Sequence, residues 1–272
     1  MKKFEGMLIC TDLDGTLFNS DREISQENRN AIEYFKANGG FFTFITGRMP
    51  FYAQKAYEGI DPNCPFGCNN GGALYDHRKQ EYVWRLELNE EALNLAEDVS
   101  KQLPKVGWHI AAFQHTYFCV DSPFMVGFRE RTNVKYRAQA DRPVGEPMAK
   151  IAFCDDDYDL ITRVKGLIDD HPLAHRFEMI RSENTIYEIM PIGANKGTAL
   201  QKLTELLNLD PKNTIAIGDY DNDVKMLEAA GCGVAVANAA PSAKAVANRI
   251  TVSNDEHAIA ALIRDLEAGK IL

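Results

Sequence analysis

The sequence predicts an α/β fold, a Rossmann-like core with a mostly parallel sheet and an inserted α+β domain. Strands alternate with helices at both ends of the 272-residue chain, which favours parallel pairing through right-handed crossovers. The middle contains hairpin-like strand pairs instead. Acidic motifs directly follow two buried strands, where sites form in open α/β sheets. The domain boundaries that follow are 1–84 and 189–272 for the core and 85–188 for the insertion.

The first quarter of the chain alternates apolar strands with helices. Ser25 is a typical N-cap residue, and Gly39 and Gly40 are suited to end the helix that Ser25 begins. The strand that follows, Phe-Phe-Thr-Phe-Ile, is wholly apolar or β-branched. The elements predicted here are strands at 7–10, 41–45 and 66–70 and helices at 25–38 and 50–58.

The last third of the chain resumes the same alternation. Its helices are expected at 196–207, 222–229, 240–246 and 256–267, and its strands at 214–217, 234–236 and 249–252.

The middle of the chain has a different pattern. Strands at 73–75 and 82–85 flank Asp-His-Arg-Lys, which is a hairpin signal, and a second hairpin is expected over 176–190. The remaining elements predicted are helices at 90–103, 123–136 and 155–170 and strands at 109–113, 117–120 and 149–154.

Composition excludes several classes of function. The net charge of −9 and the pI near 5.2 argue against nucleic-acid or membrane-surface binding, which needs a basic face. No run of eighteen apolar residues and no secretory signal is present. The six scattered cysteines indicate a reduced, cytoplasmic setting. No protein partner is implied.

Asp12 and Asp14 are the most informative pair of residues. They follow the apolar run Met-Leu-Ile, and Gly15 next to them allows a sharp turn. Two carboxylates are therefore expected close together at the end of a buried strand. Like charges in such a place raise a pKa or recruit a cation, and Mg²⁺ suits carboxylate and carbonyl oxygens. A plain surface turn is the alternative, but a turn needs no second acid at this spacing.

Two further motifs suit an anionic ligand. Thr46 and Gly47 follow the second strand, where a hydroxyl and exposed N–H groups fit phosphate oxygens. A structural Thr-Gly turn remains open there. Lys196 opens a helix, where the dipole disfavours a cation, so an anionic partner would explain its position. A solvated Lys is the alternative.

A second acidic cluster follows the strand at 214–217. It contains Asp219, Asn222 and Asp223, and it resembles a metal site. An acidic N-cap for the next helix is the simpler interpretation. Two acidic clusters at parallel strand ends favour a joint site.

Together these motifs resemble the haloacid dehalogenase-like hydrolase superfamily. The match consists of Asp12-x-Asp14-Gly-Thr, then Thr46-Gly47-Arg, then Lys196, then Gly-Asp219-x-x-Asn222-Asp223. Asn-Asn-Gly-Gly at 69–72 and Asn-Lys-Gly at 195–197 look like the Cof-type branch of metabolite phosphatases. The family more often has Ala where this chain has Gly72. About 150 residues separate Thr46 from Lys196, which matches the cap domain that this branch inserts between its second and third motifs.

The resemblance implies a Mg²⁺-dependent phosphatase of small phosphorylated metabolites, sugar phosphates or phosphorylated cofactors, that forms an aspartyl-phosphate. It implies that Asp12 is the nucleophile and Asp14 the general acid and base. Asp12, the Asp14 carbonyl and Asp219 would hold Mg²⁺, with Asp223 behind them. The groups that would bind the phosphoryl oxygens are the backbone of Leu13 and Gly47 and the side chains of Thr46, Lys196 and Asn222.

Two other functions stay open at this point. A phosphomutase would use the same aspartyl-phosphate and differ only in returning the phosphoryl group to its product. A non-catalytic metabolite sensor could use the same scaffold, although binding alone would not need Asp14.

Overall fold

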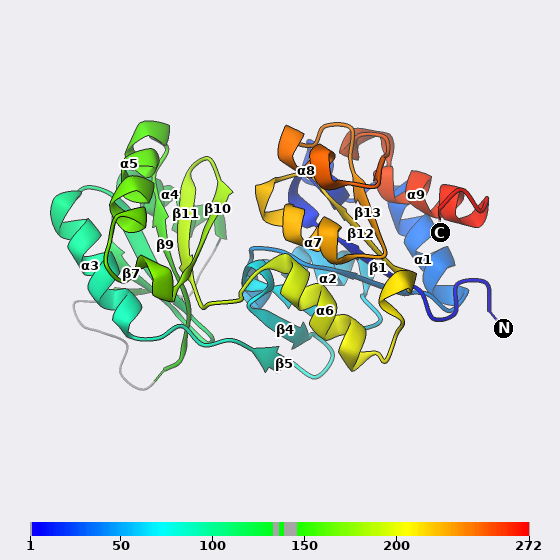
Figure 1. Cartoon of the computed structure of the whole chain (residues 1–272), viewed down its shortest axis with the longest axis horizontal. Coiled ribbons are helices and arrows are strands. Elements are labelled where there is room, and N and C mark those ends of the chain that lie inside the picture. The colour runs from blue at the N-terminus through cyan, green and yellow to red at the C-terminus, as the bar shows by residue number, and fades with distance from the viewer. Residues whose placement is uncertain (1, 133–135, 139–145, 272) are drawn as a thin grey trace. The chain divides into compact units, whose positions relative to one another are not determined.

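The computed structural model describes residues 2–132, 136–138 and 146–271. The chain forms two compact units. The first unit combines Met1–Arg85 with Asn195–Leu272, and the second unit is Leu86–Ala194. The second unit therefore interrupts the first in sequence, and each has its own sheet (Figure 1).

The first unit is built on a five-stranded sheet in which every neighbouring pair is parallel. Its strand order is β14-β13-β12-β1-β2, so β1 lies between β12 and β2. This confirms the predicted α/β class. The strands are β1 (Leu8–Thr11), β2 (Phe41–Phe44), β12 (Thr214–Gly218), β13 (Cys232–Ala235) and β14 (Arg249–Ile250).

Six helices and a small antiparallel sheet complete the first unit. Ser25 caps the first helix as predicted, because its side chain accepts a hydrogen bond from the Asn28 N–H. The helices are α1 (Gln26–Ala37), α2 (Gln54–Ile60), α6 (Lys196–Leu206), α7 (Val224–Ala229), α8 (Pro241–Val246) and α9 (Ala258–Glu267). The small sheet consists of β3 (Phe66–Cys68), β4 (Ala73–Asp76) and β5 (Glu81–Arg85).

The second unit is an α+β fold with a six-stranded sheet in the order β10-β11-β9-β6-β7-β8. All its neighbouring pairs are antiparallel except β7 with β8. The strands are β6 (Gly107–Ala112), β7 (Thr116–Val120), β8 (Tyr136–Ala138), β9 (Met148–Cys154), β10 (Glu178–Glu183) and β11 (Ile186–Met190). The helices are α3 (Glu91–Gln102), α4 (Pro123–Thr132) and α5 (Tyr158–Asp169).

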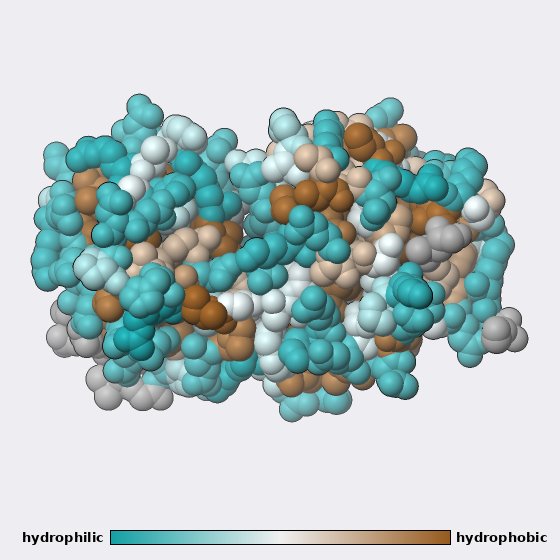
Figure 2. All heavy atoms as spheres, in the orientation of Figure 1, coloured by the Kyte–Doolittle hydropathy of each residue, from teal (hydrophilic) through white to brown (hydrophobic). Residues whose placement is uncertain are grey.

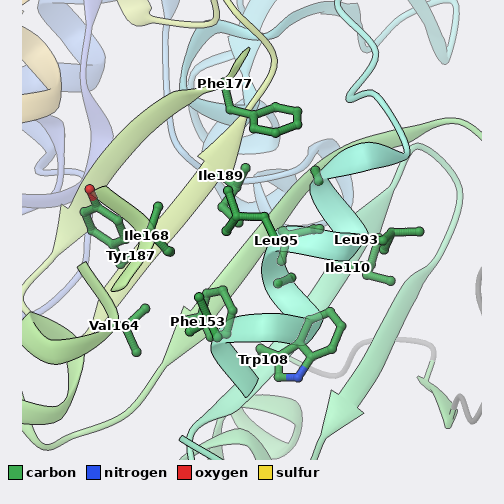
Figure 3. Packing of buried hydrophobic residues seen from close by; sticks show 14 of the residues in the cluster. Leu93, Leu95, Trp108, Ile110, Phe153, Val164, Ile168, Phe177, Tyr187 and Ile189 are labelled. Atoms are coloured by element: carbon green, nitrogen blue, oxygen red, sulfur yellow. The ribbon is translucent and has the colours of Figure 1, made fainter. Parts of the chain in front are cut away.

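Strand alternation gives the second unit a core on one face of its sheet (Figure 3). Trp108 and Ile110 on β6 point into the same cluster as Phe153 on β9. Leu95 of α3 and Val164 of α5 cover them. Each large side chain removed from water in this way contributes about 1.5–3 kcal/mol. A smaller cluster on the intervening positions contains Phe118, Met125, Ala152 and Cys154.

The strand expected over 66–70 ends at Cys68, the helix expected over 256–267 begins at Ala258, and two other predicted helices differ more from the structure. Of the helix expected over 123–136, Pro123–Thr132 is helical, positions 133–135 lie outside the described residues, and Tyr136–Ala138 is a strand that pairs in parallel with β7. The helix expected over 50–58 is divided at Ala53 into a 3₁₀ turn, Pro50–Tyr52, and α2. In both places the local sequence favours a helix. Strand pairing with β7 decides the first case and the turn at Pro50–Tyr52 decides the second, and both depend on the rest of the fold.

In the described part of the chain, no helix has the length and hydrophobicity needed to cross a bilayer. The face drawn in Figure 2 is largely hydrophilic, and its apolar residues form small separate groups.

His109 makes the stability of the second unit pH-dependent. It is buried on β6, with its ring 5.6 Å from the Phe118 ring and 5.8 Å from the Phe128 ring. Burial, with a smaller effect of Lys150, lowers the pKa of His109 to about 3. The unfolded chain, with an ordinary His pKa near 6.5, binds a proton between these values and the folded chain does not. Stability therefore falls as the pH drops below about 6.5.

We expect His109→Phe to remove about 2 kcal/mol of the stability difference between pH 7 and pH 5. Urea unfolding followed by Trp108 fluorescence, in a Trp84→Phe background, measures this difference. An equal pH dependence with and without His109 would contradict the assignment.

Candidate active site

Asp12 stands where β1, an inner strand of the five-stranded sheet, ends. It follows β1 in an extended conformation, with φ −71° and ψ 169°. Its N–H still donates to the Ile217 carbonyl of β12, at 2.8 Å. The chain then turns sharply at Gly15, which has φ +80°. A Cβ on Gly15 would lie 2.6 Å from Oδ2 of Asp219, so only glycine permits this close approach.

Three carboxylates from the loops after β1 and β12 meet at this point. Asp12, Asp219 and Asp223 each offer an oxygen, and these oxygens lie within 4.8 Å of one another. Burial raises the pKa of Asp12, its acidic neighbours raise it further, and Lys196 opposes them. Burial, followed by the charge of Asp223, raises the pKa of Asp219 to about 6. The sequence predicts that the Asp12 and Asp14 carboxylates crowd together, and the structure corrects this: the carboxylates close to Asp12 are those of Asp219 and Asp223.

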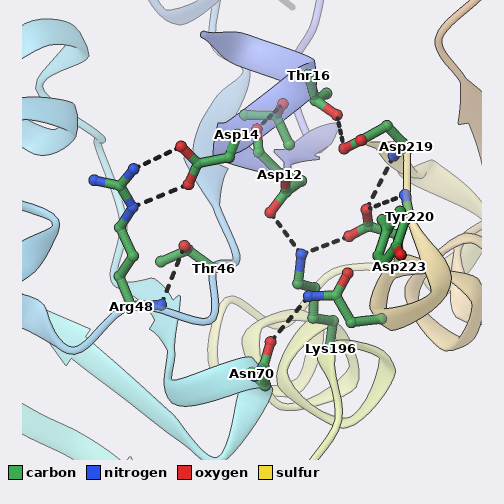
Figure 4. A network of polar contacts seen from close by, with 12 residues as sticks. Asp12, Asp14, Thr16, Thr46, Arg48, Asn70, Lys196, Asp219, Tyr220 and Asp223 are labelled. Atoms are coloured by element: carbon green, nitrogen blue, oxygen red, sulfur yellow. Dashed lines mark hydrogen bonds and ion pairs between the residues drawn. The ribbon is translucent and has the colours of Figure 1, made fainter. Parts of the chain in front are cut away.

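Lys196 lies inside this acidic cluster (Figure 4). Its Nζ is 2.5 Å from Oδ1 of Asp12 and 2.6 Å from Oδ1 of Asp223, and the residue is 1% exposed. Burial alone would lower the pKa of Lys196, but Asp12 and Asp223 outweigh it and raise the pKa. The residue is therefore a buried cation with two anionic partners and not a solvated lysine.

Asp223 and Thr16 orient the rest of the acidic cluster. Oδ2 of Asp223 accepts the N–H groups of Asp219 and Tyr220, at 2.9 and 3.0 Å. Because its other oxygen faces Lys196, Asp223 is engaged on both sides and is fully buried. The Thr16 hydroxyl donates to Oδ1 of Asp219 at 2.8 Å. The Thr16 contact thus fixes the Asp219 carboxylate, and Asp223 supports the backbone of Asp219 and the ammonium group of Lys196.

Asp14 lies outside the carboxylate group. Its side chain is 49% exposed and points toward Arg48, away from Asp12 and Lys196 (Figure 4). Arg48 Nη2 is 2.6 Å from Oδ1 of Asp14, and Arg48 Nε is 3.0 Å from Oδ2. The two aspartates of the first motif are thus directed to different cations.

The residues predicted to bind phosphate come from the segments after β1, β2 and β12 and from the start of α6. Thr46 is buried beyond the end of β2, and its Oγ1 accepts the Arg48 N–H at 3.3 Å. A Cβ on Gly47 would lie 2.9 Å from the Asn70 side chain, whose Oδ1 accepts a hydrogen bond from Nδ2 of Asn222 at 3.0 Å. Asn70 therefore lies between two of the predicted residues. Leu13, the remaining one, follows Asp12 in the same loop.

Sequence reasoning missed the specific contacts of Thr16 and Asn70. The Asn-Asn-Gly-Gly segment was a usable signal for Asn70, because Gly71 has φ +88° and a Cβ there would lie 2.1 Å from the Asn195 carbonyl oxygen. A run of this kind indicates close packing of the loop against another element. Thr16 gave no signal beyond its place in the first motif.

The donor set fits a hard divalent cation. Three carboxylates and one ammonium group leave a formal charge of −2 in a buried space. Burial raises the pKa of Asp12 and of Asp219, repulsion between the acids raises it further, and a cation would relieve that repulsion. Oxygen ligands of this kind suit Mg²⁺.

The chain is similar to a known protein family, to proteins of Bacillus subtilis and to a solved structure. The family model of the haloacid dehalogenase-like hydrolases matches residues 9–263. YxeH of Bacillus subtilis is 30% identical over 274 residues, which cover 97% of this chain and 99% of that protein. The 5-amino-6-(5-phospho-D-ribitylamino)uracil phosphatase YitU of the same species is 28% identical, covering 95% and 96%. A crystal structure of a haloacid dehalogenase-like hydrolase from Bacteroides thetaiotaomicron superimposes with a TM-score of 0.83 at 25% identity, covering 96% and 100%.

Proposed function

The chain belongs to the haloacid dehalogenase-like hydrolases, and we propose that it is a Mg²⁺-dependent phosphatase that hydrolyses small phosphorylated metabolites through an aspartyl-phosphate. The observation that supports this most directly is the buried group of Asp12, Asp219 and Asp223 with Lys196 between two of them. The name of the relative YitU, a phosphatase of a phosphorylated ribitylamino compound, supports a small phosphate ester as substrate.

Asp12 is the proposed nucleophile. A carboxylate attacks phosphorus only when it is ionised, and burial beside two other acids works against ionisation. Lys196, 2.5 Å from Asp12, supplies the opposing charge. One Asp12 oxygen forms a bond to phosphorus as the ester P–O bond breaks, which yields the aspartyl-phosphate.

Asp14 is the proposed general acid and base. Its carboxyl proton passes to the departing ester oxygen in the first step. The carboxylate then takes a proton from the water that attacks phosphorus in the second step, which restores both aspartates. Thr46, Asn222, Lys196 and the N–H groups of Leu13 and Gly47 are proposed to bind the phosphoryl oxygens, where negative charge spreads in the transition state.

Asp12, Asp219 and the Asp14 carbonyl are the groups proposed to hold Mg²⁺, with Asp223 in support. Bound there, the ion would neutralise the charge of the phosphoryl oxygens. We also propose that the inserted domain, predicted as 85–188, serves as a cap that selects the substrate.

A screen of phosphorylated metabolites tests the proposal. With Mg²⁺ present, we expect release of inorganic phosphate from at least one sugar phosphate or phosphorylated cofactor, without an isomerised product. An isomerised hexose phosphate would indicate a phosphomutase instead. Negligible turnover across the panel would contradict the proposal and favour a sensor.

Chelation tests the metal requirement separately. We expect exhaustive EDTA treatment to lower the turnover number by at least about 100-fold, because the cation is proposed to stabilise transition-state charge. Added Mg²⁺ should restore the activity. Preformed Mg–EDTA at equal concentration is the control for effects of the chelator itself. Full activity after complete removal of metal would rule out the Mg²⁺ site.

A further inference from the structure

We propose that Arg48 is a positioning residue for Asp14, which it holds apart from the carboxylate group that contains Asp12. This inference rests on the proposed function, since it concerns the general acid of that reaction. The pairing could not be derived from the motif, in which Arg48 is equally suited to contact phosphate directly.

The contact between Arg48 and Asp14 fixes the direction of the carboxyl group. Two guanidinium nitrogens donate to the two different oxygens, at 2.6 and 3.0 Å. Bidentate pairing of this kind sets the plane of a carboxylate as well as its distance. Figure 4 shows the Asp14 side chain directed into this contact and away from Lys196.

Arg48 is itself held by its surroundings. Its Nη1 donates to the Tyr52 carbonyl at 3.3 Å, and its guanidinium carbon lies 5.6 Å from the centre of the Phe18 ring. Its carbonyl oxygen accepts the Asn69 N–H at 2.9 Å. A side chain that is fixed in this way keeps the Asp14 carboxylate in a defined position.

The stability of the fold does not account for this pair. The Asp14 side chain is 49% exposed and that of Arg48 is 33% exposed, and ion pairs at such exposure contribute little to stability. The chemistry gives a stronger reason. If Asp14 turned inward, it would become a fourth carboxylate beside Asp12 and a competitor for Lys196.

Arg48 therefore keeps the two catalytic aspartates in separate roles. Asp12 is paired with Lys196, and Asp14 is paired with Arg48. Proton transfer by Asp14 needs one of its oxygens, so one contact with Arg48 opens while the other keeps the group in place. The loss of Arg48 should accordingly impair the proton transfer more than the attack on phosphorus.

The leaving group of the substrate distinguishes these two steps. An alkyl phosphate needs protonation of its departing oxygen, whereas p-nitrophenyl phosphate has a good leaving group and needs little. We expect Arg48→Ala to lower kcat for the alkyl phosphate by about 10- to 100-fold and kcat for p-nitrophenyl phosphate by less than about 3-fold. Arg48→Lys, which offers a single point charge, should recover part of the loss.

A double-mutant cycle with Asp14→Asn shows whether Arg48 acts through Asp14. We expect Asp14→Asn to have the same dependence on the leaving group, and the double variant to be no slower than Asp14→Asn within about 2-fold. Equal losses on both substrates, a change in KM alone, or multiplied losses in the double variant would overturn the inference and assign Arg48 to phosphate binding. If the wild-type protein turns over neither substrate nor any member of the metabolite panel, the proposed function itself fails, and the role of Arg48 fails with it.

Discussion

Replacing Asp12 by Asn is expected to reduce kcat below about one ten-thousandth of the wild-type value, because the variant lacks the proposed nucleophile. The exchange preserves the shape of the side chain and an oxygen that can face Lys196. It also removes one negative charge from a group of three buried carboxylates. The folded state should therefore not be destabilised, and the loss should appear as chemistry alone.

The measurement is steady-state phosphate release with the best substrate of the screen, together with thermal unfolding of each variant. Asp21→Asn is the matched control, since it makes the same exchange at an exposed position of the first unit. Acid quenching during turnover should trap a phosphorylated wild-type chain and no phosphorylated Asp12→Asn chain. Wild-type activity in the purified variant would show that another residue attacks phosphorus.

Lys196→Met is expected to impair both activity and stability. The substitution keeps the apolar length of the side chain but leaves Asp12 and Asp223 facing each other without their shared cation. Breaking a buried ion pair from one side costs about 3–5 kcal/mol. Because Lys196 is proposed to stabilise charge in the transition state, we expect its loss to lower kcat/KM by about 100- to 1,000-fold.

Lys202→Met is the matched control on the same helix. Lys202 is also in α6, but its side chain is 39% exposed and its partner Glu205 lies on the surface, so its replacement should change stability by less than about 1 kcal/mol. Urea unfolding without Mg²⁺ and kcat/KM with Mg²⁺ are measured for both variants. Similar stability of the two variants would mean that Lys196 does not balance the acidic cluster.

Local sequence patterns were sufficient to predict most of the helices and strands. β1 and β2 are short apolar or β-branched runs, and they pair in parallel as the predicted α/β class requires. Ser25 begins α1 as predicted. The strand at Tyr136–Ala138 could not be found in this way, because its pairing with β7 is a long-range contact that local preference does not contain.

The sequence by itself determined that Asp12 and Asp219 would meet at the candidate site, but its expectation that the Asp14 carboxylate would join them was wrong. Strand ends in a parallel sheet share one edge, so Asp12 and Asp219 were expected to lie near each other, with Lys196 supplied by a nearby helix. Only the tertiary structure decided which carboxylate pairs with which cation. Asp12 shares Lys196 with Asp223, and Asp14 turns outward to Arg48. These pairings join residues distant in the chain, and they depend on strand order, side-chain direction and burial, which no spacing within a motif specifies.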